Sequence, residues 1–320
     1  MKAKVLFLGA VLVSGLVSPA LAQDQPKDER IFTRIHDVIY GRKFGTALTL
    51  DVFTPKAGTN GLAIIWVVSG GWFSAHESIT PGFIDEYLKR GYTVFAVVHG
   101  SQPKFTIPEA IADMKRAVRY IRANAKEYHI DPDHIGVTGG SAGGHLSCML
   151  GTDSDPGDPN AKDPVDRVSS RVQAVACFFP PTDFLNYGKT GEDAIGRGIL
   201  AGFHAPFDFH EFDQKTKSFV TITDDAKIRE LGKQISPIEH VTSDDAPTLI
   251  IHGDEDKLVP IQQAETFIAK LKKEGVDEKL IVKAGAQHGW PNLLGDIPTL
   301  ADWFDDHLKP KKAAPETAPK

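Results

Sequence analysis

The apolar positions of this chain follow two patterns, and the first gives way to the second near residue 60. Within "TALTLDVFTP" (46–55), apolar and polar residues alternate, which places Leu48, Leu50 and Val52 on one face of a half-buried antiparallel strand. The preceding "IFTRIHDVIY" (31–40) is the expected partner of that strand. The alternation therefore predicts an antiparallel pair at the start of a sheet.

Beyond residue 60 the apolar residues gather into short, nearly continuous runs. Such runs are typical of strands that are buried on both faces of a parallel sheet covered by helices. Six segments have this character: 62–69, 92–98, 134–139, 172–179, 247–253 and 278–285. Together with the antiparallel pair they predict eight strands.

Helical spacing separates several of these runs. The segment 109–128 carries an apolar stripe opposite a charged face, formed by Ile111, Met114, Val118, Ile121 and Ala125. The pattern returns at 261–275 and stops at Gly275, a typical C-terminal cap. The alternation predicts an α/β fold, with a doubly wound, mostly parallel eight-stranded sheet and an antiparallel edge.

The interval 183–243 interrupts this alternation and is rich in Phe, His, Gly and Asp. We expect a cap-like excursion after the sixth strand, with some helix, that covers one end of the sheet and is not a separate domain. The final 311–320 is rich in Pro, Ala and Lys, which predicts a disordered tail. One domain over 23–310 is the expected organisation.

Residues 1–22 have the order of a secretory signal peptide. Two lysines precede an apolar stretch (5–17), and Ala20-Leu21-Ala22 offers small residues for cleavage after Ala22. The apolar stretch is shorter than the roughly 20 residues of a membrane span. The expectation is export to the periplasm or the exterior with no membrane span after signal removal; a retained N-terminal anchor is the alternative.

The net charge of the chain limits the classes of binding partner that we expect. Without residues 1–22 the chain has 34 basic and 42 acidic residues, a formal charge of −8, which argues against nucleic acid and anionic membrane as partners. The charge leaves the oligomeric state open.

Cys148 and Cys177 both lie in apolar segments, so two buried free thiols are expected, with one disulfide as the alternative.

The stretch "GGSAGG" (139–144) lies between an expected strand and an expected helix. Its G-x-S-x-G pattern matches the nucleophile elbow, in which a serine on a strained turn is exposed above the sheet edge. Neighbouring glycines relieve clashes with the strand and the helix. A Gly-rich turn that cradles a phosphate is the alternative, although neither a dinucleotide-binding nor a P-loop pattern is matched.

A serine nucleophile needs a base and an acid to orient it, and the expected order along the chain is Ser, acid, His. Asp256 lies in the loop after 247–253, and His288 lies in the loop after 278–285. We therefore predict Ser141, His288 and Asp256 as nucleophile, base and orienting acid. Asp254, Glu255 and Asp183 are the other candidate acids; Asp254 and Asp183 are more typical of turn residues.

Other polar residues favour a structural role. His145, one helical turn after Ser141, and His252, at a strand end, are expected to pack near the site, and the histidines have no paired metal spacing. The acidic "DSDPGDPNAKD" (153–163) resembles a calcium loop, but Gly157 stands where a ligand is required. No cofactor or metal is predicted.

The oxyanion of an acyl-transfer reaction needs backbone N–H donors. The predicted donors are Ala142, which follows the nucleophile, and the glycines after the 62–69 strand, Gly71 and Gly70. Trp72 and Trp290, which adjoin the glycine loop and His288, are the predicted substrate-binding residues.

These residues resemble the α/β-hydrolase superfamily. "GGSAGG", "HGDEDKLVP" and "HGW" are similar to patterns of the acetyl-xylan/feruloyl esterase-like (BD-FAE-like) and prolyl-oligopeptidase-like groups, and the resemblance covers about 31–308. It implies an α/β-hydrolase fold and an exported serine hydrolase of carboxylic esters that forms an acyl-enzyme, with acylated carbohydrate as one substrate class. A prolyl-oligopeptidase-type peptidase and a catalytically silent binding protein are the alternatives.

The sequence departs from these groups at one position. Their oxyanion loop usually begins with histidine, and here Ser69 stands in its place. The two following glycines are kept, so the N–H donors are retained. How the loop is held without that histidine is a question for the structure.

Overall fold

The computed structural model describes residues 30–310 of the 320-residue chain. The signal peptide predicted at 1–22 and the tail predicted at 311–320 lie outside the described residues. Within the described part, none of the helices has the length and apolar character needed to span a membrane.

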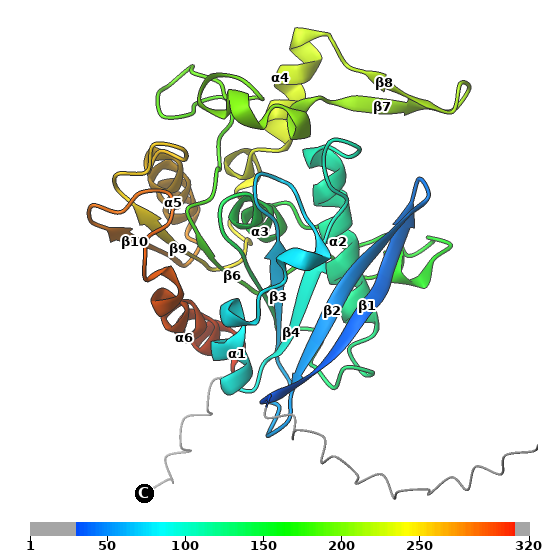
Figure 1. The fold of residues 1–320 in the computed structure, drawn as a ribbon, viewed down its shortest axis with the longest axis vertical. Helices are drawn as coiled ribbons and strands as arrows, with labels where there is room; N and C mark the ends of the chain where they lie inside the picture. Colours follow the sequence, from blue (N-terminus) through cyan, green and yellow to red (C-terminus); the bar gives the residue numbers. More distant parts are fainter. Residues whose placement is uncertain (1–29, 311–320) are drawn as a thin grey trace, which may run out of the picture. The chain divides into compact units, whose positions relative to one another are not determined.

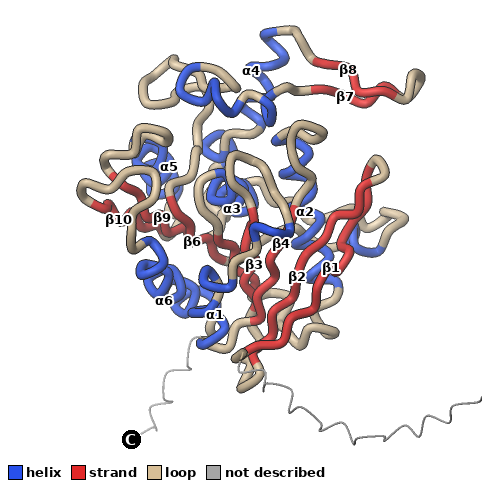
Figure 2. Tube along the Cα trace, in the orientation of Figure 1, coloured by secondary structure: helices blue, strands red, loops and turns tan. Residues whose placement is uncertain are grey.

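One sheet of eight strands forms the centre of the fold (Figure 2). In spatial order it consists of β1 (Phe32–Lys43), β2 (Thr46–Pro55), β4 (Thr93–Val98), β3 (Ala63–Val68), β5 (Ile135–Thr138), β6 (Ala174–Phe178), β9 (Thr248–Gly253) and β10 (Glu278–Lys283). The eight predicted segments each contain one of these strands.

Strand direction follows the two apolar patterns of the sequence. β1 pairs with β2 and β2 with β4 in antiparallel register, whereas the pairs from β4 through β3 to β10 are parallel. The parallel strands β3, β5 and β6 are buried at every position. The predicted doubly wound sheet with an antiparallel edge is confirmed, because only strands covered on both faces tolerate such continuous apolar runs.

Helices cover both faces of the sheet (Figure 1). The longer helices α2 (Ile107–Ala123), α3 (Ala142–Thr152) and α5 (Gln262–Glu274) share one apolar cluster, and α1 (Asp85–Lys89) and α6 (Ile297–Leu308) share the other. Alternate residues of a strand enter different clusters: Ile65 faces the first and Ile64 the second. The sheet thus separates two cores.

Both predicted amphipathic helices form, and one is shorter than its apolar stripe. In α2 the Glu109 carboxylate accepts the backbone N–H of Thr106 at 2.7 Å, a capping box that starts the helix at Ile107. The helix ends at Ala123, because the side-chain amide of Asn124 donates to the carbonyl of Tyr120 and ends the turn. Helix α5 ends as expected at Gly275, in left-handed conformation.

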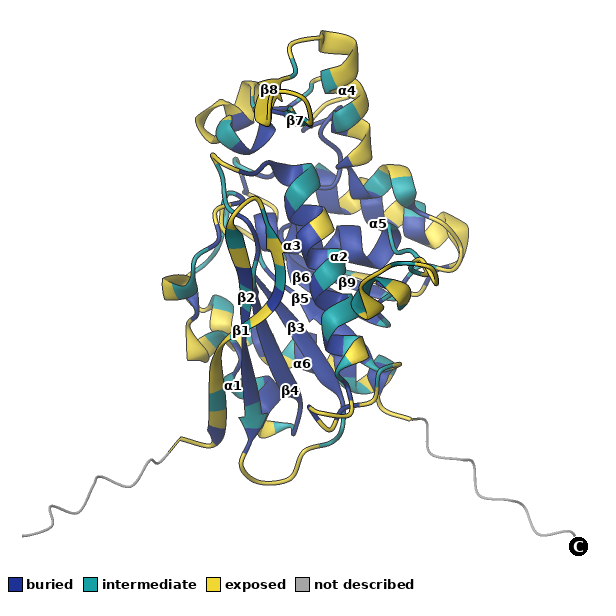
Figure 3. Ribbon diagram, turned by 90° about the vertical axis from the view of Figure 1, so that its right-hand side faces the viewer, coloured by how far each residue is buried: buried dark blue, intermediate teal, exposed yellow. Residues whose placement is uncertain are grey.

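The excursion, defined as residues 183–243, lies beyond the carboxyl ends of the parallel strands (Figure 1). It contains the short helices η4 (Gly198–Phe203), η5 (Ala205–Phe207) and η6 (Pro237–His240), the helix α4 (Asp225–Gln234) and the hairpin of β7 (His210–Asp213) and β8 (Ser218–Thr221). Figure 3 shows β8 and the outer side of α4 as exposed, whereas β7 is mostly half-buried. The excursion covers one end of the sheet, as the sequence predicts.

The two cysteines lie at the interface between α3 and β6. Cys148 and Cys177 are buried free thiols, with sulfur atoms 3.8 Å apart. Burial in this apolar contact, followed by the hydrogen bond and charge of the neighbouring thiol, raises the pKa of Cys148. The expectation of two buried thiols is therefore met, and the raised pKa keeps the Cys148 thiol protonated.

Candidate active site

Ser141 occupies the turn between β5 and α3. Its backbone has φ 54° and ψ −119°, a conformation that costs an L-residue on the order of 1–3 kcal/mol. The Ser141 N–H donates to the carbonyl of Phe178 at 3.0 Å, which fixes the turn against β6. The strained turn is thus held in place by the sheet itself.

Two flanking glycines make this turn sterically accessible. A Cβ atom on Gly139 would lie 2.6 Å from the backbone of Gly143, and one on Gly143 would lie 2.8 Å from the carbonyl oxygen of Val67. Both distances are shorter than any normal carbon contact, so no other residue fits without moving the strand or the helix. The sequence argument for glycine on both sides of the serine is supported.

Ser141, His288 and Asp256 form a continuous line of hydrogen bonds. His288 Nε2 lies 2.9 Å from Ser141 Oγ, and His288 Nδ1 lies 2.7 Å from Asp256 Oδ2. An ionised carboxylate can only accept, so Nδ1 carries the proton and Nε2 accepts from the serine hydroxyl. Residues 147 positions apart in the chain are brought together, because the turns after β5, β9 and β10 lie at the same edge of the sheet.

Asp256 is buried and strongly held. Its Oδ1 accepts the backbone N–H groups of Leu258 and Val259, both at 2.9 Å. Burial alone would raise the pKa of Asp256, but hydrogen bonds involving the His252 and His288 imidazoles and the Val259 N–H outweigh it and hold that pKa well below its usual range. The carboxylate is therefore charged at any working pH.

The other candidate acids have structural partners. Asp254 accepts the N–H of Gly285 at 2.7 Å and ties the loops after β9 and β10 together, while exposed Glu255 pairs with Lys257. Asp183 accepts the N–H of Leu185 within its own turn at 2.9 Å. Their geometry leaves Asp256 as the carboxylate that contacts His288.

The predicted oxyanion donors are only partly available. Gly70 donates its N–H to the carbonyl of Phe73 at 3.0 Å, so the role predicted for Gly70 requires correction: this tight turn occupies the donor. The N–H of Gly71 has no acceptor among residues 30–310, and Ala142 is the first residue of α3, where helical N–H groups lack intrahelical partners. These two donors remain for an oxyanion.

His99, which the sequence analysis did not single out, supplies an imidazole to the loop that begins at Ser69. His99 Nδ1 lies 2.8 Å from the carbonyl of Gly100 and Nε2 lies 2.9 Å from Ser69 Oγ. Because a carbonyl only accepts, Nδ1 is the protonated nitrogen and Nε2 accepts from the Ser69 hydroxyl. Burial first, opposed by the Gly100 hydrogen bond and aided by the charge of Lys43, lowers the pKa of His99 to about 4.

Trp72 is almost wholly buried, with 4% of its surface exposed. Its indole N–H donates to His145 Nδ1 at 3.0 Å, and His145 Nε2 in turn bonds the carbonyl of Ile235 at 2.7 Å. Burial, which outweighs that carbonyl bond, lowers the pKa of His145 to about 4. His145 therefore has the packing role expected, and it joins the loop of Trp72 to the excursion.

Trp290 packs against aromatic residues near His288 and is not among the residues that line the space beside Ser141. Its indole N–H donates to Asp296 at 2.7 Å, and its ring packs edge-on against Phe178 and Phe179. Phe179 also contacts the His288 ring, with centroids 4.5 Å apart. Trp290 thus packs against Phe179, which contacts the histidine, and its predicted contact with substrate stays a prediction.

The space beside Ser141 is small. About 10 Å³ is free, roughly the room of one water molecule. Apart from Ser141 it is lined by Gly71 and by apolar side chains of the core, the excursion and the loop after β9: Trp72, Pro181, Leu200, Phe203, Leu258 and Val259. The ring of Phe203 packs directly on Gly71, since a Cβ atom on Gly71 would lie 2.8 Å from that ring.

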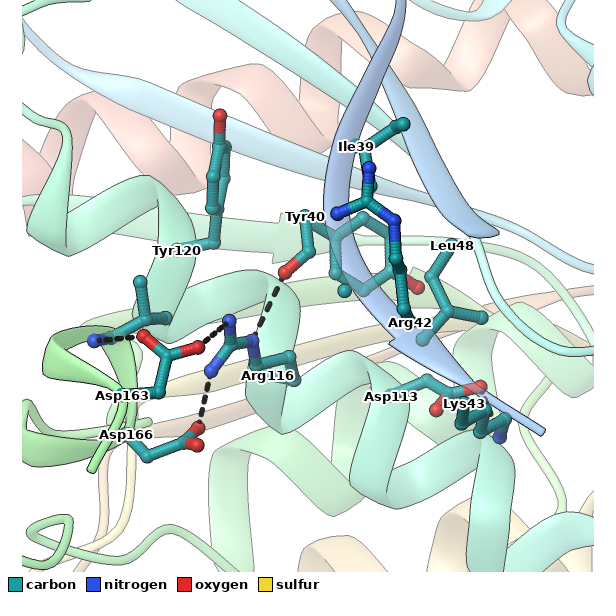
Figure 4. Close-up of a pocket in the computed structure, with 12 residues that line it drawn as sticks. Ile39, Tyr40, Arg42, Lys43, Leu48, Asp113, Arg116, Tyr120, Asp163 and Asp166 are labelled. Carbon is teal, nitrogen blue, oxygen red and sulfur yellow. Dashed lines mark hydrogen bonds and ion pairs between the residues drawn. The ribbon is translucent and has the colours of Figure 1, made fainter. Parts of the chain in front are cut away.

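A larger depression of about 450 Å³ lies elsewhere, between β1, α2 and η3 (Pro164–Arg167), and Figure 4 draws its side chains. The Arg116 guanidinium contacts Asp163 at 2.6 Å, Asp166 at 2.7 Å and the carbonyl of Tyr40 at 3.0 Å. Asp163 is the last residue of the loop that resembles a calcium site, Asp166 follows it in η3, and the arginine already neutralises both. The depression offers no activated nucleophile.

The fold and the hydrogen-bonded line together define an α/β-hydrolase. A family model adds the finer assignment: the BD-FAE model matches residues 50–271, and the chain belongs to this family. The matched region runs from β2 through α5 and contains Ser141 and Asp256, but it stops before His288.

Individual relatives agree with this assignment. "Probable carboxylic ester hydrolase LipM" of Mycobacterium tuberculosis is 30% identical over 266 residues, covering 81% of this chain and 56% of that protein. The chain spans about half the length of the curated relatives it matches. A solved "Truncated form of carbohydrate esterase from gut microbiota" is 28% identical, with a TM-score of 0.69 over 87% of this chain and 98% of that one.

A second solved structure carries a similar name. The "acetyl ester-xyloside bifunctional hydrolase" of Caldicellulosiruptor lactoaceticus is 25% identical, with a TM-score of 0.64 over 84% of this chain and 92% of that one. The likeness extends over most of both chains, so it concerns the whole α/β unit.

Proposed function

We propose that this chain is an exported serine hydrolase of carboxylic esters that works through an acyl-enzyme. The observation that carries the proposal is the line of hydrogen bonds from Ser141 Oγ through His288 to Asp256, 2.9 and 2.7 Å long. An alcohol at its ordinary pKa is a poor nucleophile, and this arrangement is the one that activates it. The esterase names of LipM and of both solved relatives support the same reaction.

In the first half of the reaction, Ser141 Oγ attacks the acyl carbon while His288 Nε2 accepts its proton. Asp256 holds the imidazole by its Nδ1–H and stabilises the imidazolium that forms. The N–H groups of Gly71 and Ala142 donate to the oxygen that becomes negative. The tetrahedral intermediate then expels the alcohol, which takes the proton from His288.

Water completes the cycle. It attacks the acyl carbon as His288 Nε2 takes one of its protons, and the returning proton restores the Ser141 hydroxyl as the carboxylic acid leaves. Asp256 stays ionised throughout, because its pKa lies well below its usual range. The same three side chains therefore serve both halves.

The acyl group is proposed to be short. The free space of about 10 Å³ beside Ser141 has apolar walls from Leu200, Phe203 and Val259, so it has room for a methyl group, the part of an acetyl group beyond the acyl carbon, and not for a bulky aromatic acyl group. Acetylated carbohydrate is the proposed substrate class, in line with the names of the two solved relatives.

Export is proposed from the signal-like order of residues 1–22. Amino-terminal sequencing of protein from the periplasm and the medium of the producing cells tests it. A new amino terminus at Gln23 is the expected result, and uncleaved chain in the membrane fraction would favour the retained anchor.

The purified protein tests the reaction directly. We expect release of p-nitrophenol from the acetyl ester, weaker release from the butyryl ester, and none from p-nitroanilides of Pro-containing peptides. A fluorophosphonate probe should label Ser141, as found by mass spectrometry of the labelled peptide. Labelling without turnover of any ester, or preferential cleavage of the peptide anilide, would contradict the proposal.

Ser141→Ala is the matched variant. It should lower kcat by at least about 10³-fold and abolish probe labelling, because the alanine has no hydroxyl to acylate. The melting temperature should change little, since the hydrogen bonds that hold the turn use the backbone. Activity equal to that of the unaltered protein would place the nucleophile elsewhere.

A further inference from the structure

A β-bulge in the edge strand brings one histidine and a second acidic residue beside a buried carboxylate. Between Ile35 and Val38 the register of β1 against β2 shifts, so that His36 and Asp37 together oppose the single residue Asp51. Asp37 adopts φ 55°, which redirects the strand. Adjacent residues of a regular strand point to opposite faces, and the bulge allows both to approach Asp51.

A third segment completes the cluster. His76 begins the short helix η1 (His76–Ser78), five residues after Gly71 in the loop that follows β3. His76 Nε2 lies 3.0 Å from Asp51 Oδ1 and 3.6 Å from Asp37 Oδ1. From the bulge, His36 Nδ1 lies 3.3 Å from Asp51 Oδ2. The two imidazole nitrogens and the nearest carboxylate oxygen of Asp51 all lie within 4.8 Å of one another.

These spacings match the edges of a metal coordination polyhedron. In a tetrahedral zinc site the ligands lie at 2.0–2.2 Å from the metal, which puts neighbouring ligand atoms ~3.3 Å apart. The distances from His76 Nε2 to Asp51 Oδ1 (3.0 Å) and to Asp37 Oδ1 (3.6 Å) are close to this value, and His36 Nδ1 lies 3.3 Å from the other oxygen of Asp51. Two imidazoles and a carboxylate are also a donor set that zinc and similar divalent metals prefer.

Burial and charge distinguish this cluster from a chance surface group. The side chain of Asp51 is 1% exposed, whereas those of His36 and His76 are 54% and 30% exposed, so a metal could enter from solvent while the carboxylate stays fixed. Arg34 Nε contacts Asp51 Oδ2 at 2.5 Å, and the Asp37 N–H donates to Oδ1 at 3.0 Å. Such contacts around a ligating carboxylate orient it, as they do in metal sites generally.

The positive charge of the Arg34 guanidinium repels a metal cation bound nearby, and the negative charges of the Asp51 and Asp37 carboxylates offset this repulsion. Asp51 and Asp37 carry two negative charges, and the imidazoles bind metal in their neutral form. Because the Arg34 guanidinium pairs with Oδ2, whereas Oδ1 accepts the uncharged Asp37 N–H and lies beside His76, Oδ1 is the oxygen that would face the metal. This balance predicts a reversible site rather than a permanently filled one.

We propose that His36, His76 and Asp51 form a binding site for a divalent transition metal, zinc in particular, with Asp37 or water as the fourth ligand. A metal bound there links the bulge of β1 to the loop that carries Gly71. It would stabilise the attachment of that loop to the sheet edge. The site does not depend on ester hydrolysis, and its failure leaves the proposed function untouched.

Cobalt(II), a spectroscopic substitute for zinc, tests the site with a readout separate from activity. Untagged purified protein, first treated with EDTA, is titrated with Co²⁺. The expected result is a visible absorption band of four-coordinate cobalt that saturates at one ion per chain and is displaced by one equivalent of Zn²⁺. Zn²⁺ should also raise the melting temperature, and EDTA should reverse the increase.

Three variants decide which residues are responsible. His36→Ala and His76→Ala should each lose the band, whereas His204→Ala, an exposed imidazole of the excursion that pairs with Asp208, should keep it. His36→Ala in the metal-free state should melt as the unaltered protein does, because its side chain is largely exposed. No saturable cobalt band, or a band of equal strength in His36→Ala, would overturn the proposal.

Discussion

In the glycine loop after β3, Ser69 stands where the resemblance leads us to expect histidine, and the side chain of His99 contacts it. The imidazole is instead supplied from the end of β4, and its neutral Nε2 accepts the Ser69 hydroxyl at 2.9 Å. The loop is therefore held by the same chemical group, which comes from a neighbouring strand.

Ser69→Ala should lower kcat by about 5- to 10-fold with little change in KM. The lost hydrogen bond is worth on the order of 1 kcal/mol, and its role is to hold the Gly71 N–H where the oxyanion develops. Steady-state kinetics on p-nitrophenyl acetate checks this. Ser69→Thr keeps the hydroxyl and should restore most of kcat; an equal loss in both variants would mean that the hydroxyl is irrelevant.

Residue positions in the site were predictable where strand order determines them. Ser141, Asp256 and His288 follow strands of a parallel sheet, and the carboxyl ends of such strands meet at one edge. The engagement of the Gly70 N–H was not predictable, because it depends on a tight turn that returns Phe73 to it. Nor was His99, whose contact crosses between neighbouring strands.

Among the elements, the excursion forms part of the wall of the space beside Ser141. Leu200 and Phe203 of η4 line the small space beside the serine, and the Phe203 ring lies over Gly71. The β7–β8 hairpin lies farther along the same excursion and carries Phe219, whose ring packs against Phe44 and not against the site. Two aromatic residues of one segment thus have separable roles.

Phe203→Ala should enlarge the acyl space and raise butyrate hydrolysis relative to acetate hydrolysis by about 10-fold. A fit of one or two methylene groups in an apolar pocket is worth roughly 1–3 kcal/mol. The ratio of kcat/KM values for the two p-nitrophenyl esters is the measurement. Phe219→Ala is the matched control, since the two residues are 36% and 37% exposed, and it should leave the ratio unchanged. An unaltered ratio in both variants would show that the excursion does not shape the acyl site.

Elements with a clear apolar pattern were predictable, and elements without one were not. The strands of the sheet and the helices α2 and α5 follow from alternation, continuous runs or a helical stripe. The hairpin strands β7 and β8 have four residues each, and β8 is exposed at every position, so no alternation marks them. Their pairing is settled by contacts with Phe44 from the β1–β2 turn, which are distant in sequence.

At the scale of the whole molecule, two buried neutral histidines make stability depend on pH. The pKa values of His99 and His145 are both lowered to about 4, from 6.5 in an unfolded chain. Between these values the unfolded chain binds more protons than the folded one, so stability is full above pH 6.5 and falls as the pH drops towards 4. Each group contributes up to about 3 kcal/mol to this fall.

Urea unfolding at pH 7.5, 5.5 and 4.5 should therefore give a free energy of unfolding that decreases at each step. In His145→Gln the decrease should be smaller, because the amide can still accept from Trp72 and donate to Ile235 but does not titrate. A free energy that is constant over this range, or a slope unchanged by the substitution, would contradict the assignment.

The border strand β10 has a consequence for how this protein loses activity. β10 is an outer strand bonded only to β9, its residues are mostly half-covered, and His288 follows five residues after its end. Local unfolding of such an edge strand requires much less free energy than unfolding of the central strands. Mild heat or denaturant should thus separate His288 from Ser141, and stop ester hydrolysis, in molecules whose central strands are still intact.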